Sequence, residues 1–207
     1  MLSAQAVVNA GVEAVREHGL DALSVRALAE RLSVTPMALY RHVASAEALS
    51  LGVVEAVLLQ VPAVESTGTW EARANAWAHA ARTVLAEHPG VARFVLTHWF
   101  GSAAALDHVE ALLTAAETAE LRGFAGVAAV NAVFTFVLMR VEAEQAIRGA
   151  GVIKRQLASD PKGERGRWPR LKANRSEYTV ARLDLHFDYG LDALLTGIRS
   201  HKQHEHT

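Results

Sequence analysis

Side chains suited to binding DNA gather in one short part of this sequence, residues 24–43, which read SVRALAERLSVTPMALYRHV. Arginine presents a fork of donors that can reach a guanine edge or a phosphate, while tyrosine and histidine can donate to phosphate oxygens. Proline and methionine offer apolar contact to the methyl group of thymine. The residues of this segment predicted to contact DNA are Arg26, Thr35, Pro36, Met37, Tyr40, Arg41 and His42.

Two short helices must position these side chains. An apolar stripe recurs at helical spacing within residues 24–32, and a second stripe, Leu39 and Val43, follows after a tight turn at Ser33 and Val34. Helices joined this closely must cross steeply, which is the helix-turn-helix arrangement. The second helix then buries one side only, so its free side can enter a major groove about 12 Å wide.

The same spacing also fits an ordinary helical hairpin, in which Arg26 and Arg41 are solvated and Tyr40 is a half-buried core residue. Local charge favours DNA binding slightly, because residues 22–46 hold three arginines against one glutamate. The charge of the whole chain points the other way, since it is −1 at pH 7 and DNA-binding domains usually carry a positive excess.

The composition restricts the class of protein. With 207 residues, of which 51% are hydrophobic and 21% charged, the chain can form a sizeable core, and intrinsic disorder is excluded. It contains no cysteine, which excludes disulfides, cysteine-ligated zinc and a catalytic thiol. The absence of cysteine is in keeping with a reducing cytoplasm.

Neither a signal peptide nor a membrane span is expected. The N-terminus has no basic cluster ahead of an apolar run, and the longest charge-free stretch, between Arg122 and Arg140, is 17 residues long. About 20 apolar residues are needed to cross a bilayer. We therefore expect that stretch to be a helix buried in protein, and the protein to be cytoplasmic with no membrane partner.

Apolar residues recur at intervals of three and four almost from end to end, so the fold class is predicted to be all-α. Two segments interrupt this pattern. Residues 61–68 are interpreted as a hinge, and residues 151–175, which are rich in charge, glycine and proline, as a long loop. The predicted helices lie near 3–18, 24–32, 35–42, 45–60, 69–87, 89–100, 103–121, 123–150 and 176–199.

The segment GLDALSVRALAERLSVTPMALYRHVASAEAL resembles the N-terminal DNA-binding domain of the TetR family of transcriptional repressors. The shared pattern is long: a Gly-Leu step, the helix-turn-helix, Leu-Tyr with a histidine two residues after the tyrosine, and Ser-x-Glu-Ala-Leu opening the next helix. The resemblance implies that Tyr40 and His42 lie on the phosphate backbone, with the arginines, Pro36 and Met37 near bases. The sequence departs from the family pattern at Ala46, where the family usually has a phosphate-binding lysine. Without this lysine, DNA binding should be weaker, and the slope of the logarithm of the binding constant against the logarithm of salt concentration should be smaller by about 0.9.

The C-terminal part carries a second resemblance. FDYGLDALLTGI, residues 187–198, is similar to the final helix of the branch that contains the tetracycline repressor, where it helps to build the dimer interface. Residues 123–150 also favour a dimer, because they are too uniformly apolar to be half-exposed and their small residues let another helix approach closely. The resemblance implies a homodimer, and two reading helices about 34 Å apart would match a palindromic double-stranded DNA operator. We expect a helix-turn-helix DNA-binding domain over 1–48, a connecting helix and hinge over 49–68, and a ligand-binding and dimerisation domain over 69–207.

A pocket for a small-molecule effector is expected between the helices near 69–87, 89–100 and 123–150. Aromatic walls with one or two polar groups are typical of a ligand site, although a tryptophan stripe at helical spacing is also typical of a core. In the tetracycline-binding pattern that the resemblance implies, only Glu142 matches. A magnesium–tetracycline ligand is therefore not expected, and a larger or more apolar molecule is. The predicted lining is Trp77, Ala81, Val95, His98, Trp99, Val127, Asn131, Phe134, Leu138 and Glu142.

Other chemistry finds little support in the sequence. None of the ten histidines follows a glutamate by three positions, and HExxH, P-loop and GxSxG motifs are absent. We therefore expect no catalytic residue, no cofactor and no metal. Residues 148–175 hold nine basic against two acidic residues; we interpret them as a solvated loop, with a second nucleic-acid contact as the alternative, and Trp168 as a hypothetical lid over a ligand.

Together these patterns predict a ligand-responsive repressor that binds a palindromic operator as a dimer and is released by a small apolar or aromatic molecule. One rival is a helical small-molecule-binding dimer that has lost DNA recognition, and another is a helical-bundle enzyme. Residues 1–50 carry four basic against five acidic residues. We therefore expect weak non-specific DNA binding, with the affinity concentrated in the specific site.

Overall fold

The computed structural model describes residues 2–98, 101–150 and 168–204. Within these ranges all regular structure is helical, which confirms the all-α fold class. The chain divides into two compact units, residues 1–141 and residues 142–207. The long helix α8 (Gly123–Ala150) crosses the boundary between them.

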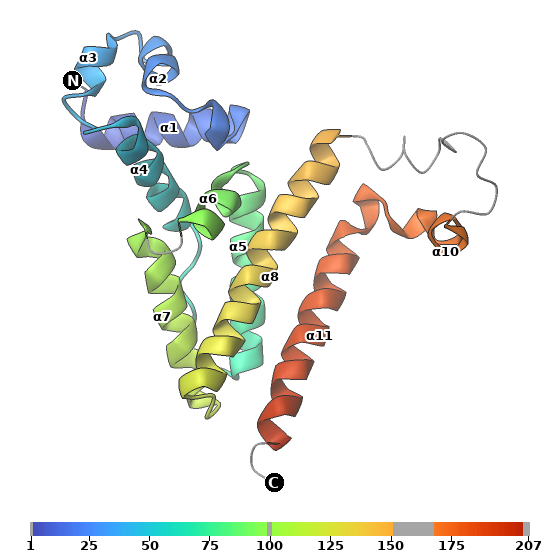
Figure 1. The fold of residues 1–207 in the computed structure, drawn as a ribbon. Helices are drawn as coiled ribbons and strands as arrows, with labels where there is room; N and C mark the ends of the chain where they lie inside the picture. The colour runs from blue at the N-terminus through green and yellow to red at the C-terminus, as the bar shows by residue number, and fades with distance from the viewer. Residues whose placement is uncertain (1, 99–100, 151–167, 205–207) are drawn as a thin grey trace. The chain divides into compact units, whose positions relative to one another are not determined.

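Four helices begin the first unit, and each follows a serine or threonine that caps it. The hydroxyl of the cap accepts a hydrogen bond from the N–H three residues on, at 3.0–3.3 Å, which satisfies one of the free donors of the first turn. Helix α1 packs on α4 (Figure 1). Gly11 permits this close approach, because a Cβ there would lie 2.5 Å from Cγ2 of Val53. The helices are α1 (Ala4–His18), α2 (Val25–Arg31), α3 (Pro36–Leu39) and α4 (Ala46–Leu58).

Helix α4 leads from these helices to a second group of helices in the same unit (Figure 1). Residues 62–69 between α4 and the next helix are irregular and mostly exposed; the hinge expected over 61–68 stays a prediction. The core of this group is made by alanine, valine and leucine together with Trp70 and Trp77. The remaining helices of the unit are α5 (Trp70–Ala86), α6 (Val91–Thr97), α7 (Ala103–Thr118) and the first part of α8.

The end of α1 is attached to the turn between α5 and α6. The N–H of Leu20 donates to the carbonyl of Pro89 at 2.8 Å, and Arg16 lies 3.4 Å from the carboxylate of Glu87. The chain turns sharply on each side of this contact, at Gly19 (φ 79°) and Gly90 (φ 87°), where a side chain would be strained. This contact and the helix α4 both connect the helix-turn-helix to the larger group of helices.

The second unit differs from the sequence prediction at the start of its last helix. The predicted helix near 176–199 is in fact α11, Leu183–His204. Residues 175–182 form two short 3₁₀ turns, and the ring Nε2 of His186 bonds the carbonyl of Glu177 at 2.7 Å. This bond folds the chain back on the first turn of α11, so no continuous helix can run through it. The predicted loop 151–175 also contains a short helix, α10 (Pro169–Ala173), while its residues 151–167 lie outside the described residues.

Helix α8 is less buried in the single chain than its sequence suggested. Among the described residues, Gly123–Arg148 is long and apolar enough to cross a membrane by length and composition alone, a test that core helices also pass. Less than half of its most apolar window, 44%, is buried. Phe124 is 88% exposed and Val127 57% exposed. The single chain therefore leaves part of α8 open, and the burial of that part by a second chain stays a prediction.

Candidate functional site

The turn between α2 and α3 has the compact geometry of a helix-turn-helix. Ser33 lies in the left-handed region, with φ 54°, and the N–H of Val34 donates back to the carbonyl of Ala29 at 2.9 Å. Thr35 then caps α3, and Pro36 occupies its first position, where a missing N–H costs nothing. These features end α2 and begin α3 within a turn of four residues, 32–35.

Helix α3 is shorter than the predicted helix near 35–42, because it ends at Leu39. Leu39 is fully buried and fastens α3 to α2. Its carbonyl accepts hydrogen bonds from the N–H of His42 at 2.8 Å and of Val43 at 3.1 Å. The bond to His42 closes over three residues instead of four, so the last turn tightens. Tyr40, Arg41 and His42 therefore sit on this turn and not within the α-helix.

The structure leaves the predicted DNA-contacting residues accessible. Met37 is 70% exposed and Tyr40 is 48% exposed. His42 is half-buried. The other four candidates, which are exposed, are Arg26, Thr35, Pro36 and Arg41. Their contact with DNA stays a prediction.

The arginines of this region fall into two groups. Arg16 lies within 4 Å of carboxylates at Glu13 and Glu87, and Arg31 is paired with Glu17. In contrast, Arg26 and Arg41 make no side-chain hydrogen bond or ion pair to any residue that the structure describes. The two arginines predicted to contact DNA are thus the two whose donors are available to a ligand.

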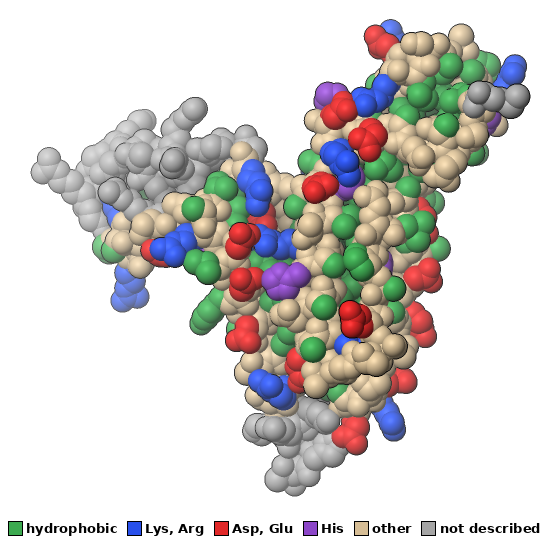
Figure 2. Space-filling model, turned by 180° about the vertical axis from the view of Figure 1, so that it is seen from behind, with side chains coloured by type: hydrophobic (Ala, Val, Ile, Leu, Met, Phe, Trp, Pro, Cys, Tyr) green, Lys and Arg blue, Asp and Glu red, His purple; other side chains and the backbone are tan. Residues whose placement is uncertain are grey.

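Surface charge elsewhere on the molecule is mixed. On the face that Figure 2 shows, lysine and arginine side chains are interspersed with aspartate and glutamate, without a broad basic area over the described residues. Long-range attraction of DNA needs such an area. On this face, therefore, no such area is present among the described residues.

Lowering the pH is expected to weaken the contact between α1 and α2. Arg31 donates a hydrogen bond of 2.7 Å to each carboxylate oxygen of Glu17, which holds the pKa of Glu17 below its usual value. The pair therefore stabilises the folded state above the ordinary carboxyl range, and this stabilisation is lost as the pH falls through the lowered pKa. The effect is small because both side chains are exposed. In an NMR titration, Arg31→Met should return the pKa of Glu17 to its ordinary value; an unchanged pKa would contradict the assignment.

Five of the ten residues predicted to line the ligand site are buried in the first unit. They include an aromatic pair, because the rings of Trp77 on α5 and Phe134 on α8 stack with centroids 5.1 Å apart. His108 on α7, which the sequence analysis did not single out, lies 6.2 Å from Trp77 by ring centroids. The five buried residues are Trp77, Ala81, Val95, Phe134 and Leu138.

The other predicted lining residues have different surroundings. His98 is exposed, and its ring stacks on Phe94 of its own helix with centroids 4.2 Å apart. Val127 and Asn131 are also exposed in the single chain, and Glu142 is half-buried. Trp99 lies outside the described residues. Among the described members of this set, Trp77 and Phe134 are in ring contact.

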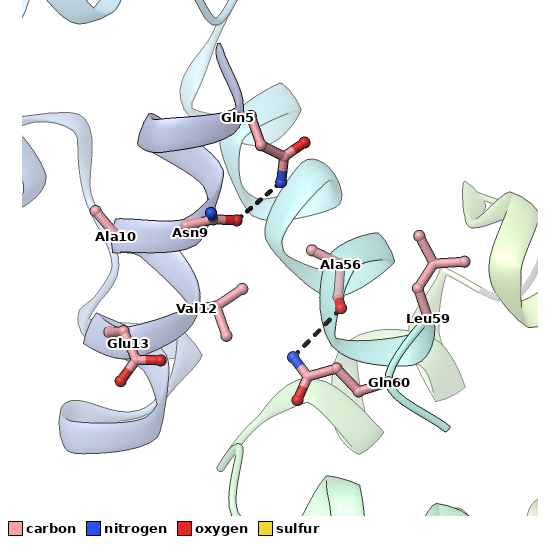
Figure 3. Close-up of a pocket in the computed structure, with 8 residues that line it drawn as sticks. All are labelled: Gln5, Asn9, Ala10, Val12, Glu13, Ala56, Leu59 and Gln60. Carbon is pink, nitrogen blue, oxygen red and sulfur yellow. Dashed lines mark hydrogen bonds between the residues drawn. The ribbon is translucent and has the colours of Figure 1, made fainter. Parts of the chain in front are cut away.

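A separate groove of about 620 Å³ lies between α1 and α4 (Figure 3). Its amide groups are occupied by neighbours on the same helix: Gln5 donates to Asn9 at 2.8 Å, and Gln60 donates to the carbonyl of Ala56 at 3.4 Å. None of the predicted ligand residues lines it. We assign no ligand to this groove.

Sequence reasoning missed a polar contact that fastens α4 to α7. One carboxylate oxygen of Glu55 accepts from the hydroxyl of Ser102, and the other accepts from the N–H of Ala104, each at 2.7 Å. One turn further on, the ring Nε2 of His108 bonds the carbonyl of Leu58 at 3.1 Å. The only signal in the sequence is a single carboxylate within the apolar run SLGVVEAVLL.

Comparisons with known proteins match both parts of the chain. The family model described as "Bacterial regulatory proteins, tetR family" matches residues 7–52, and the one described as "Tetracyclin repressor-like, C-terminal domain" matches residues 61–201. An HTH-type transcriptional regulator of Saccharopolyspora erythraea is 29% identical over 202 residues, which are 96% of this chain and 85% of that protein.

Solved structures show the same similarity in three dimensions. A possible TetR family transcriptional regulator from Streptomyces coelicolor A3(2) is 26% identical with a TM-score of 0.85, and the match covers 96% of this chain and 99% of that chain. BioQ, solved with its natural double-stranded DNA operator, is 25% identical with a TM-score of 0.68, covering 97% of this chain and 99% of that chain.

Proposed function

Because the chain belongs to the TetR family of bacterial transcriptional regulators, we propose that it is a repressor that binds a palindromic operator as a homodimer. A small apolar or aromatic molecule releases the operator. The observation that carries the DNA-binding role is the pair of exposed arginines, Arg26 and Arg41, whose donors are not engaged by the described residues. BioQ, whose solved structure includes its operator, supports the proposal as a relative.

In the proposed complex, the free side of α3 and the turn after it enter the major groove. Arg41 donates to a guanine edge or a phosphate, and Met37, which is 70% exposed, contacts a thymine methyl. Tyr40 and His42 donate to phosphates and set the orientation of the helix. Residues 1–48 would thus form the DNA-binding domain, joined through 49–68 to the ligand-binding and dimerisation domain of 69–207.

The dimer is proposed to form through α8 and α11. Large apolar side chains on these helices are exposed in the single chain, and exposed apolar patches of this kind are typical of protein interfaces. A second chain would also bury the part of α8 that the single chain leaves open. The exposed side chains are Phe124, Val127, Met139, Leu185 and Tyr189.

The operator is released if the effector binds more tightly to a conformation in which the two α3 helices of the dimer no longer match the operator half-sites. The effector can shift the population toward that conformation only by the difference between its affinities for the two conformations. The stacked pair Trp77 and Phe134 is the proposed apolar wall of the effector site. We propose a cytoplasmic protein with no membrane partner, no cofactor and no metal.

A salt titration of DNA binding tests this function. From a pool of random duplexes, the protein should select a palindromic site, and the logarithm of its binding constant should fall steeply and linearly with the logarithm of salt concentration. Sedimentation in the same buffer should give the mass of a dimer. A flat salt dependence with no selected site would instead support the rival, a ligand-binding helical dimer that has lost DNA recognition.

A further inference from the structure

Arg73 on α5 is a buried cation that nothing in the function described so far uses. The residue is 6% exposed, and its Nε is buried without a hydrogen-bond partner. The guanidinium forms no ion pair with any carboxylate in the part of the chain that the structure describes. A buried charge normally has a partner, because removal from water costs several kcal/mol per ion.

Two tryptophans on the same face of α5 also carry a buried N–H donor without an acceptor. Trp70 and Trp77 lie three residues before and four residues after Arg73, so all three side chains share one face of the helix. The indole N–H of each tryptophan is buried without an acceptor. Of the five buried side-chain nitrogens found without a partner among the described residues, three belong to this face. Such a cluster of unsatisfied donors requires an acceptor.

The electrostatics of the helix end favour an anion as that acceptor. Arg73 lies in the first turns of the 17-residue helix α5, where the helix dipole adds positive potential. Its side chain runs back toward the N-terminus, since a Cβ on Gly68 would lie 3.9 Å from Cγ of Arg73. The segment in front, residues 65–69, is exposed and irregular. The N-terminal end of α5 is therefore preceded by a segment that is open to solvent.

We propose that Arg73 and Trp70 form a subsite for the anionic oxygen of an acidic aromatic ligand. The guanidinium neutralises a carboxylate or phenolate, and the indole N–H of Trp70 completes its hydrogen bonds. Trp77 lies about 6 Å further along the helix, and its stack with Phe134 receives the apolar body of the same molecule. The inference rests on the ligand-responsive function proposed above and specifies the effector as an apolar acid.

Paired probes of the same shape test this subsite in the full-length protein. Calorimetry with 2-naphthoate and the neutral 2-naphthamide should show at least tenfold tighter binding of the acid to the wild type. Arg73→Met should abolish this preference while leaving the affinity for the amide unchanged. Arg122→Met removes an exposed arginine from the same unit as a matched control and should keep the preference.

Thermal unfolding of the same proteins gives an independent readout. Without ligand, Arg73→Met should melt at a higher temperature than the wild type, because an uncompensated buried charge has been removed. 2-Naphthoate should raise the melting temperatures of the wild type and of Arg122→Met by more than that of Arg73→Met. Equal binding of the two probes, no binding of either, or a preference that persists in Arg73→Met would overturn the proposal. An Arg73→Met protein that melts lower or does not fold would overturn it too, because the guanidinium would then have a structural partner.

Operator binding is measured separately on each protein. If the acid preference holds but no operator is bound, the repressor function fails and the acid subsite stands. If the operator is bound but the acid preference is missing, only the subsite fails.

Discussion

Arg41→Ala is expected to bind the operator roughly 10- to 100-fold more weakly than the wild type, with dimer mass and stability unchanged. A good arginine contact with a base contributes about 1–3 kcal/mol. Stability should not change, because Arg41 is exposed and has no side-chain partner among the described residues. Fluorescence anisotropy with the selected operator measures the loss.

Arg16→Ala is the matched control for this prediction. It removes the same charge from the same group of helices, but Arg16 lies on α1 and pairs with exposed glutamates, away from α3. Its effect on operator affinity should be a few-fold at most. Equal affinities of wild type and Arg41→Ala would rule out the assigned reading surface.

Glu55→Ala is expected to lower the free energy of unfolding by about 2–4 kcal/mol. Hydrogen bonds to a charged group contribute more than neutral ones, and the substitution leaves two donors in or near the core without an acceptor. These are the buried hydroxyl of Ser102 and the N–H of Ala104 at the start of α7. Urea denaturation measures the change.

A double-mutant cycle shows whether the loss comes from this contact. Ser102→Ala removes one of the two donors, so the effects of Glu55→Ala and Ser102→Ala should fall short of additivity. Glu47→Ala, on the exposed first turn of the same helix α4, provides the control and should cost less than about 1 kcal/mol. Equal losses in the free energy of unfolding for the Glu55 and Glu47 variants would contradict the prediction that the α4–α7 contact stabilises the fold.

The Glu55 contact also bears on regulation. Helix α4 packs on α1 at the DNA-binding end, and Glu55 and the carbonyl of Leu58 attach it to α7. His108, which bonds Leu58, also lies beside Trp77 in the proposed effector site. A ligand that moves Trp77 would therefore act on a residue that holds α4 directly.

The helix-turn-helix could be predicted because its signals are local. The caps Ser24 and Thr35, proline at the start of α3 and the apolar stripe ending in Leu39 all lie within 16 residues. The early end of α3 and the late start of α11 could not be predicted, because each depends on a particular hydrogen bond. The first is the bond from the N–H of His42 to the carbonyl of Leu39, and the second is the bond between His186 and Glu177. Helical periodicity does not encode such bonds.

The sequence by itself determined the helical fold class and the helix-turn-helix, because periodicity and capping residues act over short distances. The family followed from the resemblance of these motifs to known regulators. Only the tertiary structure decided which charged groups have partners. Arg16 and Arg31 find carboxylates brought in by folding, whereas Arg41 and Arg73 find none among the residues that the structure describes. Partners such as Glu55 and Ser102 lie 47 residues apart, and their meeting depends on how whole helices pack against each other.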